Sequence, residues 1–359
     1  MSGAIAEVRL ADLIHTARSR NASDIHFSPN VDAAIRVDGG LEHIAGPSLS
    51  SHEIRAIAST LIDGAGLARA EAGEDVSQTW NDGDGLIRVH AFRADGGLSL
   101  SLRLLNRTLP SLEELRLPPV VSAFARRSRG LVLFAGPTGS GKSTSLAAIV
   151  DRINSTSSRR ILTIEDPIEY RHTSKRSSVV QREIGRDAPT FEKALVGALR
   201  ADPDIIVVGE MRESATMRAA LTAAETGHLV LATLHTGDAV QTIDRIVDAF
   251  SGPAQAQIRA QLAQVLVGVV CQHLVRSASG AGRRLAAEVL VANDAARVLI
   301  REMRTHQLRN VILTGRDCGM QTLEHHLGEL MAHGEIAVDA AMAVSDRSDE
   351  IRIPGSALS

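Results

Sequence analysis

The segment GPTGSGKS at positions 136–143 limits the possible folds of this chain more than any other feature. It fits the pattern G-x-x-x-x-G-K-[ST] at every position, directly follows the apolar run Leu131–Ala135 and directly precedes the helical pattern Thr144–Ile153. A strand, a glycine-rich loop and a helix in this order turn backbone N–H groups toward a phosphate, and the helix N-terminus favours an anion. A chance glycine-rich turn would lack this context, so we predict a nucleotide-binding α/β fold.

The loop supplies candidate ligands for ATP and Mg²⁺. In such loops the lysine, here Lys142, can reach the β- and γ-phosphates, and the following hydroxyl, here Ser143, can bind Mg²⁺. The candidate nucleotide-binding residues are Gly136, Pro137, Thr138, Gly139, Ser140, Gly141, Lys142, Ser143 and Thr144.

Two acidic residues and a histidine each follow another apolar run of strand length. The pairs are Ile161–Ile164 with Glu165, Ile205–Val208 with Glu210, and Leu229–Thr233 with His235. Ligands collect at the carboxyl ends of strands in α/β sheets, and a P-loop needs one carboxylate for Mg²⁺ and another for the attacking water. Taken singly, the acids could be solvated loop residues and the histidine a core residue. Together they predict a catalytic site, in which the histidine senses the γ-phosphate or positions water.

The alternation of apolar runs with helical patterns begins near residue 120 and predicts a parallel sheet covered on both faces. The chain before residue 105 has short alternating segments, and Ser50 or Ser51 with Glu53 predicts a capped helix start. That region is predicted to be a small α+β domain. Apolar periodicity through Ile258–Val270 predicts a further helix.

Prolines separate the first two regions. Pro110, Pro118 and Pro119 make one continuous helix over Asn106–Pro119 unfavourable, so this segment is a predicted linker. The predicted domains are therefore residues 1–105, a linker at 106–119, an ATPase core at 120–250 and a mostly helical region at 251–359.

Composition argues against several classes of protein. A net charge of −3 and 2% aromatic residues do not favour nucleic-acid binding. Two cysteines, Cys271 and Cys318, cannot form a Cys₄ zinc site and suggest a reducing compartment. We find neither a signal-peptide pattern nor a run of roughly 18 apolar residues. We therefore expect a cytoplasmic protein, and any contact that it makes with a membrane is expected to be peripheral.

Three motifs resemble the Asp box, Walker B and His box of the secretion ATPase superfamily, which drives type II secretion and type IV pili. They are TIEDPIEY (163–170), DPDIIVVGEMR (202–212) and AAETGHLVLATLHT (223–236). ASDIHF (22–27) and IRVDG (35–39) resemble the PAS-like N-terminal domain of this family. The resemblance covers most of the chain and implies a PAS-like domain followed by a RecA-like P-loop ATPase domain.

Within the superfamily, the chain is most similar to pilus-retraction ATPases of the PilT type. GEMR and AAETGH are spelled as in that group, and AARVLIRE (295–302) and GMQTL (319–323) are similar to its C-terminal elements. Assembly motors usually carry a tetracysteine insertion, whereas the interval between Leu274 and Glu288 is short and holds no cysteine pair. The resemblance implies a homohexameric motor that retracts type IV pili for twitching motility and acts on an inner-membrane platform protein.

The resemblance also implies roles. Glu165 would be the general base, and Glu210 would hold Mg²⁺ through water. Arg88 and Arg103 would face a nucleotide, often at a subunit boundary, although each could instead be a solvated charge on a strand. Arg93 matches the arginine pattern less well. His228 has a weaker case than His235, and the roles of Arg93 and His228 stay open.

Other functions remain as alternatives. One is an assembly or secretion ATPase of a related type II or type IV pilus system. Another is a nucleotide-binding regulator with little turnover, which would have no chemical need for Glu165, Glu210 and His235. A DNA-translocating ring ATPase is disfavoured by the charge and the scarcity of aromatic residues.

Overall fold

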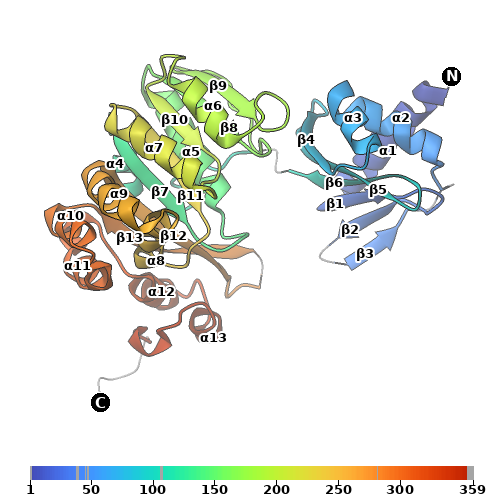
Figure 1. Ribbon diagram of the computed structural model, residues 1–359. Coiled ribbons are helices and arrows are strands. Elements are labelled where there is room, and N and C mark those ends of the chain that lie inside the picture. The colour runs from blue at the N-terminus through green and yellow to red at the C-terminus, as the bar shows by residue number, and fades with distance from the viewer. Residues whose placement is uncertain are drawn as a thin grey trace. The chain divides into compact units, whose positions relative to one another are not determined.

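The computed structural model describes residues 2–37, 40–44, 46, 48–105, 108–280 and 282–353, with side chains described from residue 9 onward (Figure 1). Asp38 and Gly39 of the IRVDG motif, and Asn106 and Arg107 of the predicted linker, lie outside these residues. The chain forms two compact units. Unit 1 comprises Met1–Leu109, Asp166–Arg171 and Arg182–Pro189, and unit 2 comprises Pro110–Glu165, His172–Gln181 and Thr190–Ser359.

Unit 1 contains an antiparallel sheet in the order β3-β2-β1-β6-β5-β4. The strands are β1 (Asp24–Phe27), β2 (Ala34–Val37), β3 (Gly40–His43), β4 (Val76–Asn81), β5 (Leu86–Ala94) and β6 (Gly97–Leu104). Helices α1 (Ser2–Ser19), α2 (Ser51–Leu61) and α3 (Gly64–Glu71) gather on one side of it (Figure 1). Ile87, Val89 and Ala91 of β5 are buried in the core shared with these helices. The alternate residues Arg88 and His90 therefore lie on the other face.

The predicted capped helix start is confirmed at Ser50. The Ser50 hydroxyl accepts from the Glu53 N–H at 3.3 Å, and the Glu53 carboxylate accepts from the Ser50 N–H at 2.9 Å. This reciprocal capping box satisfies two backbone donors at the start of α2.

Unit 2 is built on a second sheet, in the order β13-β12-β7-β11-β10-β8-β9, whose last strand ends within unit 1. The strands are β7 (Gly130–Ala135), β8 (Arg160–Glu165), β9 (Ser178–Glu183), β10 (Ile205–Val208), β11 (Leu229–Leu234), β12 (Leu266–Arg276) and β13 (Arg283–Val291). The strands β8, β10, β11, β7 and β12 run parallel, and β13 runs antiparallel to β12. The four strands predicted from apolar runs lie where we expected them.

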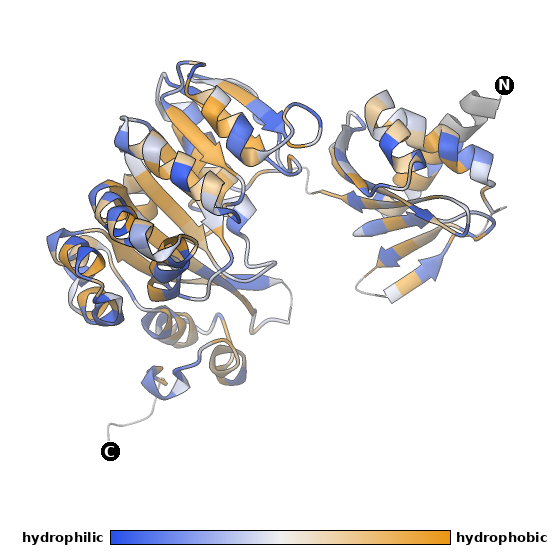
Figure 2. Cartoon of the chain, viewed as in Figure 1, coloured by the Kyte–Doolittle hydropathy of each residue, from blue (hydrophilic) through white to orange (hydrophobic). Residues whose placement is uncertain are grey.

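Helices surround this sheet in unit 2 (Figure 1). They are α4 (Pro119–Phe124), α5 (Lys142–Thr156), α6 (Phe191–Ala198), α7 (Ser214–Glu225), α8 (Ala239–Asp248), α9 (Gly252–Val265), α10 (Asp294–Arg301), α11 (Leu308–Thr314), α12 (Leu323–Ala332) and α13 (Val338–Met342). Three short 3₁₀ helices complete the described part, at Thr305–Gln307, Arg316–Cys318 and Ser348–Glu350. Every residue of β7 and β11 is buried, and Figure 2 shows the central strands as predominantly hydrophobic.

The helix predicted through Ile258–Val270 is wrong in its second half. Helix α9 ends at Val265, and the chain continues as β12, which pairs with β7. The segment Leu266–Cys271 is a continuous apolar run rich in β-branched valine, and such a run has no period that separates a buried strand from a buried helix. The region after residue 251, predicted to be mostly helical, therefore also contributes two strands to the sheet that carries the P-loop.

Among the described residues, no helix is both long and apolar enough to cross a membrane.

Candidate functional site

The P-loop joins the buried strand β7 to helix α5 by a backbone that requires glycine. Gly139 and Gly141 have φ angles of +79° and +89°, a region that side-chain-bearing residues rarely adopt. At Gly136 a Cβ atom would lie 2.4 Å from the Gln272 carbonyl oxygen, so no side chain fits. The glycines of the motif thus let the loop curl tightly at the N-terminus of α5.

Polar groups of this loop point to a phosphate ligand. Lys142 is 7% exposed, and its Nζ donates to the carbonyl oxygens of Gly136 at 2.7 Å and Pro137 at 2.9 Å. The buried Ser140 hydroxyl has no hydrogen-bond partner in the described part of the chain. A buried ammonium beside an unsatisfied hydroxyl at a helix N-terminus fits the phosphates of a nucleotide. Ser143, in the first turn of α5, is exposed and able to contact a metal ion bound to those phosphates.

Glu165 ends β8 with its carboxylate held by two side chains. Its Oε1 accepts from the Thr163 hydroxyl at 2.6 Å and from Gln181 Nε2 at 3.0 Å. Gly209, which follows β10, lies against it, since a Cβ added there would be 3.2 Å from the Glu165 Cα. The carboxylate is therefore oriented and remains half-buried, as a general base requires.

His235 connects the P-loop to Glu210. Its Nδ1 lies 3.4 Å from the Thr138 hydroxyl, and its Nε2 lies 3.3 Å from Glu210 Oε1. Burial and the Lys142 charge lower the pKa of His235, an effect that Glu210 opposes and Arg212 reinforces, and this shift favours the neutral ring. A neutral imidazole has one donor and one acceptor nitrogen, and an ionised Glu210 carboxylate only accepts. Nε2 therefore donates to Glu210, and Nδ1 accepts from Thr138.

Glu210 has a second partner, because its Oε1 also accepts from Arg212 Nε at 2.6 Å. Among the described residues, no group of three His, Cys, Asp or Glu side chains is arranged to hold a metal ion. Mg²⁺ usually keeps several waters and relies on substrate phosphates with one or two protein ligands. Ser143 and Glu210 are compatible with that kind of site.

The strand order brings the candidate residues of unit 2 to one edge of the sheet. Strands β7, β11, β10 and β8 are parallel neighbours. The P-loop, His235 and Glu210 follow the carboxyl ends of β7, β11 and β10, and Glu165 is the last residue of β8. The contacts of Thr138 with His235 and of His235 with Glu210 tie three of these ends together. This arrangement can bind a triphosphate and place an oriented carboxylate near it.

The two candidate arginines lie in unit 1, directly opposite each other on adjacent antiparallel strands. Arg88 of β5 is paired in register with Arg103 of β6. Arg103 Nε donates to Asp24 Oδ1 at 2.9 Å, and its side chain is 60% exposed. Burial alone would raise the pKa of Asp24, but the Ser23 hydroxyl and Arg103 outweigh it and lower that pKa. Arg88 forms no side-chain hydrogen bond or ion pair within the described residues.

Arg93 and His228, whose roles stay open, both contact backbone carbonyl groups. Arg93 donates to the carbonyl oxygens of Glu71 at the end of α3 and Gly96 in the β5–β6 turn. The His228 Nδ1 lies 3.0 Å from the Ala223 carbonyl oxygen, at the start of β11. His228 is thus at the opposite end of the strand from His235.

Two residues that support the site were not predicted. Thr163 precedes Glu165 by two positions on one strand, so the period of a strand could have placed both on the same face. Gln181 belongs to no motif that we identified, and its contact depends on the pairing of β9 at the sheet edge. No local pattern indicates it.

Comparison with known proteins agrees with the motifs. The family described as "Type II/IV secretion system protein" matches residues 2–353. The "Twitching motility protein" of Neisseria gonorrhoeae is 42% identical over 318 residues, covering 88% of this chain and 85% of that protein. The "Type IV pilus retractation ATPase PilT" of Pseudomonas aeruginosa is 42% identical over 333 residues, covering 92% and 96%.

A solved structure shares the fold. The crystal structure of the pilus retraction motor PilT with bound ADP superimposes with a TM-score of 0.87 at 40% identity, covering 94% of this chain and 97% of that one. These similarities confirm the resemblance and the α/β fold predicted from the motifs. The chain therefore belongs to the type II/IV secretion system protein family.

Proposed function

We propose that this protein hydrolyses ATP with Mg²⁺ and, as a homohexameric ring, powers the retraction of type IV pili. The observation that carries the proposal is the P-loop of unit 2 with Glu165, Glu210 and His235 at the ends of neighbouring parallel strands. The ADP bound by the related retraction motor, which is 40% identical over most of the chain, supports nucleotide binding by this protein.

Each residue of the site has a proposed task. Lys142 leaves the loop carbonyls to bind the β- and γ-phosphates, and the loop N–H groups surround them. Ser143 and, through water, Glu210 hold Mg²⁺, which would neutralise phosphate charge. Glu165 accepts the proton of the attacking water. His235, fixed between Thr138 and Glu210, reports the presence of the γ-phosphate.

The arginines complete the site in this proposal. Arg88 and Arg103 are carried by unit 1, and Arg88 has no protein partner among the described residues. An arginine that reaches the phosphate charge of the transition state increases the rate greatly. We propose that these two residues act on the nucleotide of a neighbouring subunit, so hydrolysis requires the ring.

The proposed cellular role follows the names of the relatives, a "Twitching motility protein" and a pilus retraction ATPase. Force would be exerted on an inner-membrane platform protein by a ring located at the cytoplasmic face of that membrane. No nucleic-acid partner is proposed. We further propose a division into a PAS-like domain (1–105), a linker (106–119), an ATPase core (120–250) and a C-terminal region (251–359); the unit boundary at Leu109 and Pro110 supports the separation at the linker.

The chemical part is tested with purified protein. Wild type should hydrolyse ATP in the presence of Mg²⁺, and Lys142→Ala should abolish hydrolysis because the buried ammonium is lost. Lys175→Ala is a matched control, since Lys175 pairs with Asp151 away from the loop. Equal rates for wild type and Lys142→Ala would rule out the P-loop as the hydrolytic site.

The cellular part is tested by deleting the gene and complementing the strain with wild type or Lys142→Ala. Excess surface pili without twitching, rescued by wild type alone, would establish retraction. Loss of pili would identify an assembly or secretion motor instead.

A further inference from the structure

A buried carboxylate outside the proposed nucleotide site binds two separate stretches of backbone. Glu183 ends β9 and is 1% exposed. Its Oε1 accepts from the Thr79 N–H at 2.9 Å, and its Oε2 accepts from the Ile168 N–H at 3.1 Å. Burying a carboxylate destabilises the folded state unless its oxygens accept hydrogen bonds. These two contacts supply such hydrogen bonds to Glu183.

Thr79 adds a third bond to the same group. Its hydroxyl donates to the Ile168 carbonyl oxygen at 2.9 Å, and the residue is 5% exposed. Thr79 lies on β4, the outermost strand of the unit 1 sheet, and its N–H serves Glu183 instead of a further strand. The three residues thus fasten the edge of β4 to the segment Asp166–Arg171. We call Thr79, Ile168 and Glu183 the β4 anchor.

Two residues of the β4 anchor, Ile168 and Glu183, are each connected to Glu165 through nearby residues of the chain. Ile168 follows Glu165 by three residues, in the same loop. Glu183 follows Gln181 by two residues on β9, and Gln181 Nε2 donates to Glu165 Oε1 at 3.0 Å. The Glu183 carboxylate therefore holds the loop that follows Glu165, through Ile168. It also belongs to β9, the strand whose Gln181 side chain contacts Glu165.

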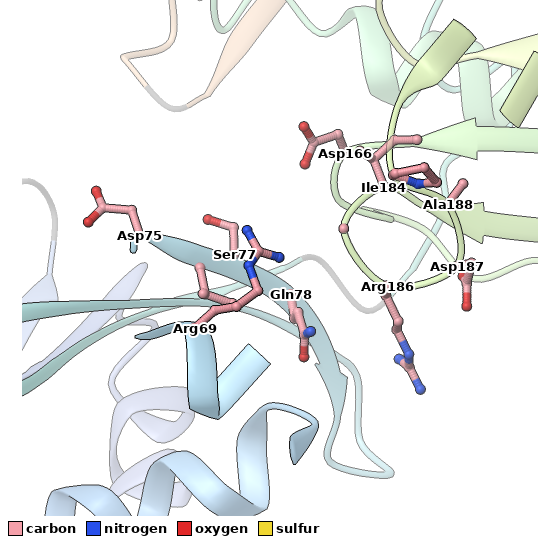
Figure 3. Close-up of a pocket in the computed structure, with 12 residues that line it drawn as sticks. Arg69, Asp75, Ser77, Gln78, Asp166, Ile184, Arg186, Asp187 and Ala188 are labelled. Atoms are coloured by element: carbon pink, nitrogen blue, oxygen red, sulfur yellow. The ribbon is translucent and has the colours of Figure 1, made fainter. Parts of the chain in front are cut away.

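A cavity of about 760 Å³ lies beside the β4 anchor in unit 1 (Figure 3). One side is formed by residues of β4 and α3, including Ser77 and Gln78, and the other by Asp166 and residues 184–189. A cavity provides no packing contacts that would resist small movements of its walls. Next to this cavity, the hydrogen bonds of Thr79 connect β4 directly to Ile168 and Glu183.

We infer that Glu183 is a positioning residue for Glu165, and that the β4 anchor ties the orientation of this base to the edge strand of unit 1. The inference rests on the proposed ATP hydrolysis, and it identifies the β4 anchor as a structure that influences the rate of that hydrolysis. A shift of β4 would also move the segment after Glu165. The Glu165 carboxylate would then no longer be oriented toward the attacking water. Nucleotide binding, which depends on the P-loop, is unaffected.

The test compares full-length variants for kcat, KM, affinity for a fluorescent ADP analogue and thermal unfolding. Glu183→Gln replaces one acceptor oxygen by a donor that faces an N–H group. Thr79→Val removes only the hydroxyl bond to Ile168. Ser77→Ala is the matched control on the same strand, because its hydroxyl contacts His90 Nδ1 at 3.0 Å instead.

We expect kcat to fall about 10- to 100-fold in Glu183→Gln and about 3- to 10-fold in Thr79→Val, because misplacing a catalytic group by roughly 1 Å is that costly. KM and ADP affinity should stay within about twofold of wild type, since ground-state binding is untouched. Ser77→Ala should match wild type in every measurement.

An unchanged kcat in both variants would overturn the inference. So would a parallel loss of ADP affinity and unfolding midpoint, which indicates a merely structural role. If Glu183→Gln fails to fold, Thr79→Val decides alone. Failure of the proposed function itself would look different, because wild type would then not hydrolyse ATP, or Lys142→Ala would be as active as wild type.

Discussion

The two units differ in how they use their sheets. In unit 2, β7 and β11 are buried at every position, and the P-loop, Glu210 and His235 lie in the loops that follow the strands. In unit 1, Ile87, Val89 and Ala91 of β5 are buried, and the partly buried Arg88 lies on the other face of the sheet, in register with Arg103. Unit 2 therefore holds the candidate nucleotide site, whereas unit 1 carries Arg103, which pairs with Asp24, and Arg88, which has no side-chain partner among the described residues. The contrast teaches that a sheet buried on both faces presents side chains for chemistry at its strand ends, whereas a sheet covered on one face presents them along its strands.

The strongest test of this contrast is removal of the candidate base. Glu165→Gln should lower kcat by about 10³-fold while nucleotide binding persists, because general-base catalysis is lost and the P-loop is intact. The measurement is steady-state ATP hydrolysis with a parallel nucleotide-binding titration. Glu169→Gln, four residues along the same loop, should change neither. Wild-type turnover by Glu165→Gln would mean that Glu165 is not the general base.

The next test asks whether the arginines of unit 1 act on another subunit. Arg88→Ala and Arg103→Ala should each lower kcat by about 10²-fold. Mixing Arg88→Ala with Glu165→Gln should then restore part of the activity, because some sites combine an intact base with an intact arginine. Arg93→Ala, a control on the same strand, should be nearly neutral. Absence of any recovery would assign the arginines to their own subunit.

Buried carboxyls sharpen the comparison through pH. In unit 2, Glu288 is 5% exposed and accepts from the Ala239 N–H at 2.8 Å. Burial raises the pKa of Glu288 from 4.5 to about 7, and the hydrogen bond from Ala239 opposes that effect only in part. The folded state then binds more protons than the unfolded state between these values, so the free energy of unfolding falls as pH rises through that window.

A shift of this size corresponds to roughly 3 kcal/mol. Glu288→Gln should remove that pH dependence while keeping an acceptor for Ala239, as measured by chemical denaturation at pH 5 and pH 7.5. In unit 1, Asp24 has the opposite sign, because its lowered pKa stabilises the fold at neutral pH and that contribution is lost as pH falls below 3.8. Identical pH profiles for wild type and Glu288→Gln would contradict the assignment.

The smallest expected effect concerns the local structure of unit 1. Ser50→Ala removes the capping box of α2 and should lower the free energy of unfolding by about 1 kcal/mol. Ser51→Ala, at the first helical position, lacks the capping contact and should cost much less. Equal losses for the two variants would mean that the cap contributes little.

The regions that could be predicted from the sequence are those whose cause is local. The P-loop is one contiguous motif, and the strands before Glu165, Glu210 and His235 are short apolar runs with punctuation after them. The capping box is likewise contained in four residues. The prediction failed at Leu266–Cys271, because a run of apolar residues is compatible with both a buried helix and a buried strand. In the structure this segment is a strand that pairs with β7.

By itself, the sequence determined that a complete P-loop motif at Gly136–Ser143 lies between a strand and a helix, and that acids and a histidine lie at the ends of three further strands, because each of these features is encoded by neighbouring residues. Only the tertiary structure decided that His235 contacts both Thr138 and Glu210, and that Gln181 holds Glu165. It also decided that Glu183 meets Thr79, which is 104 residues away along the chain. The physical reason is that strand order and edge pairing depend on which surfaces bury one another, and no local pattern records that choice.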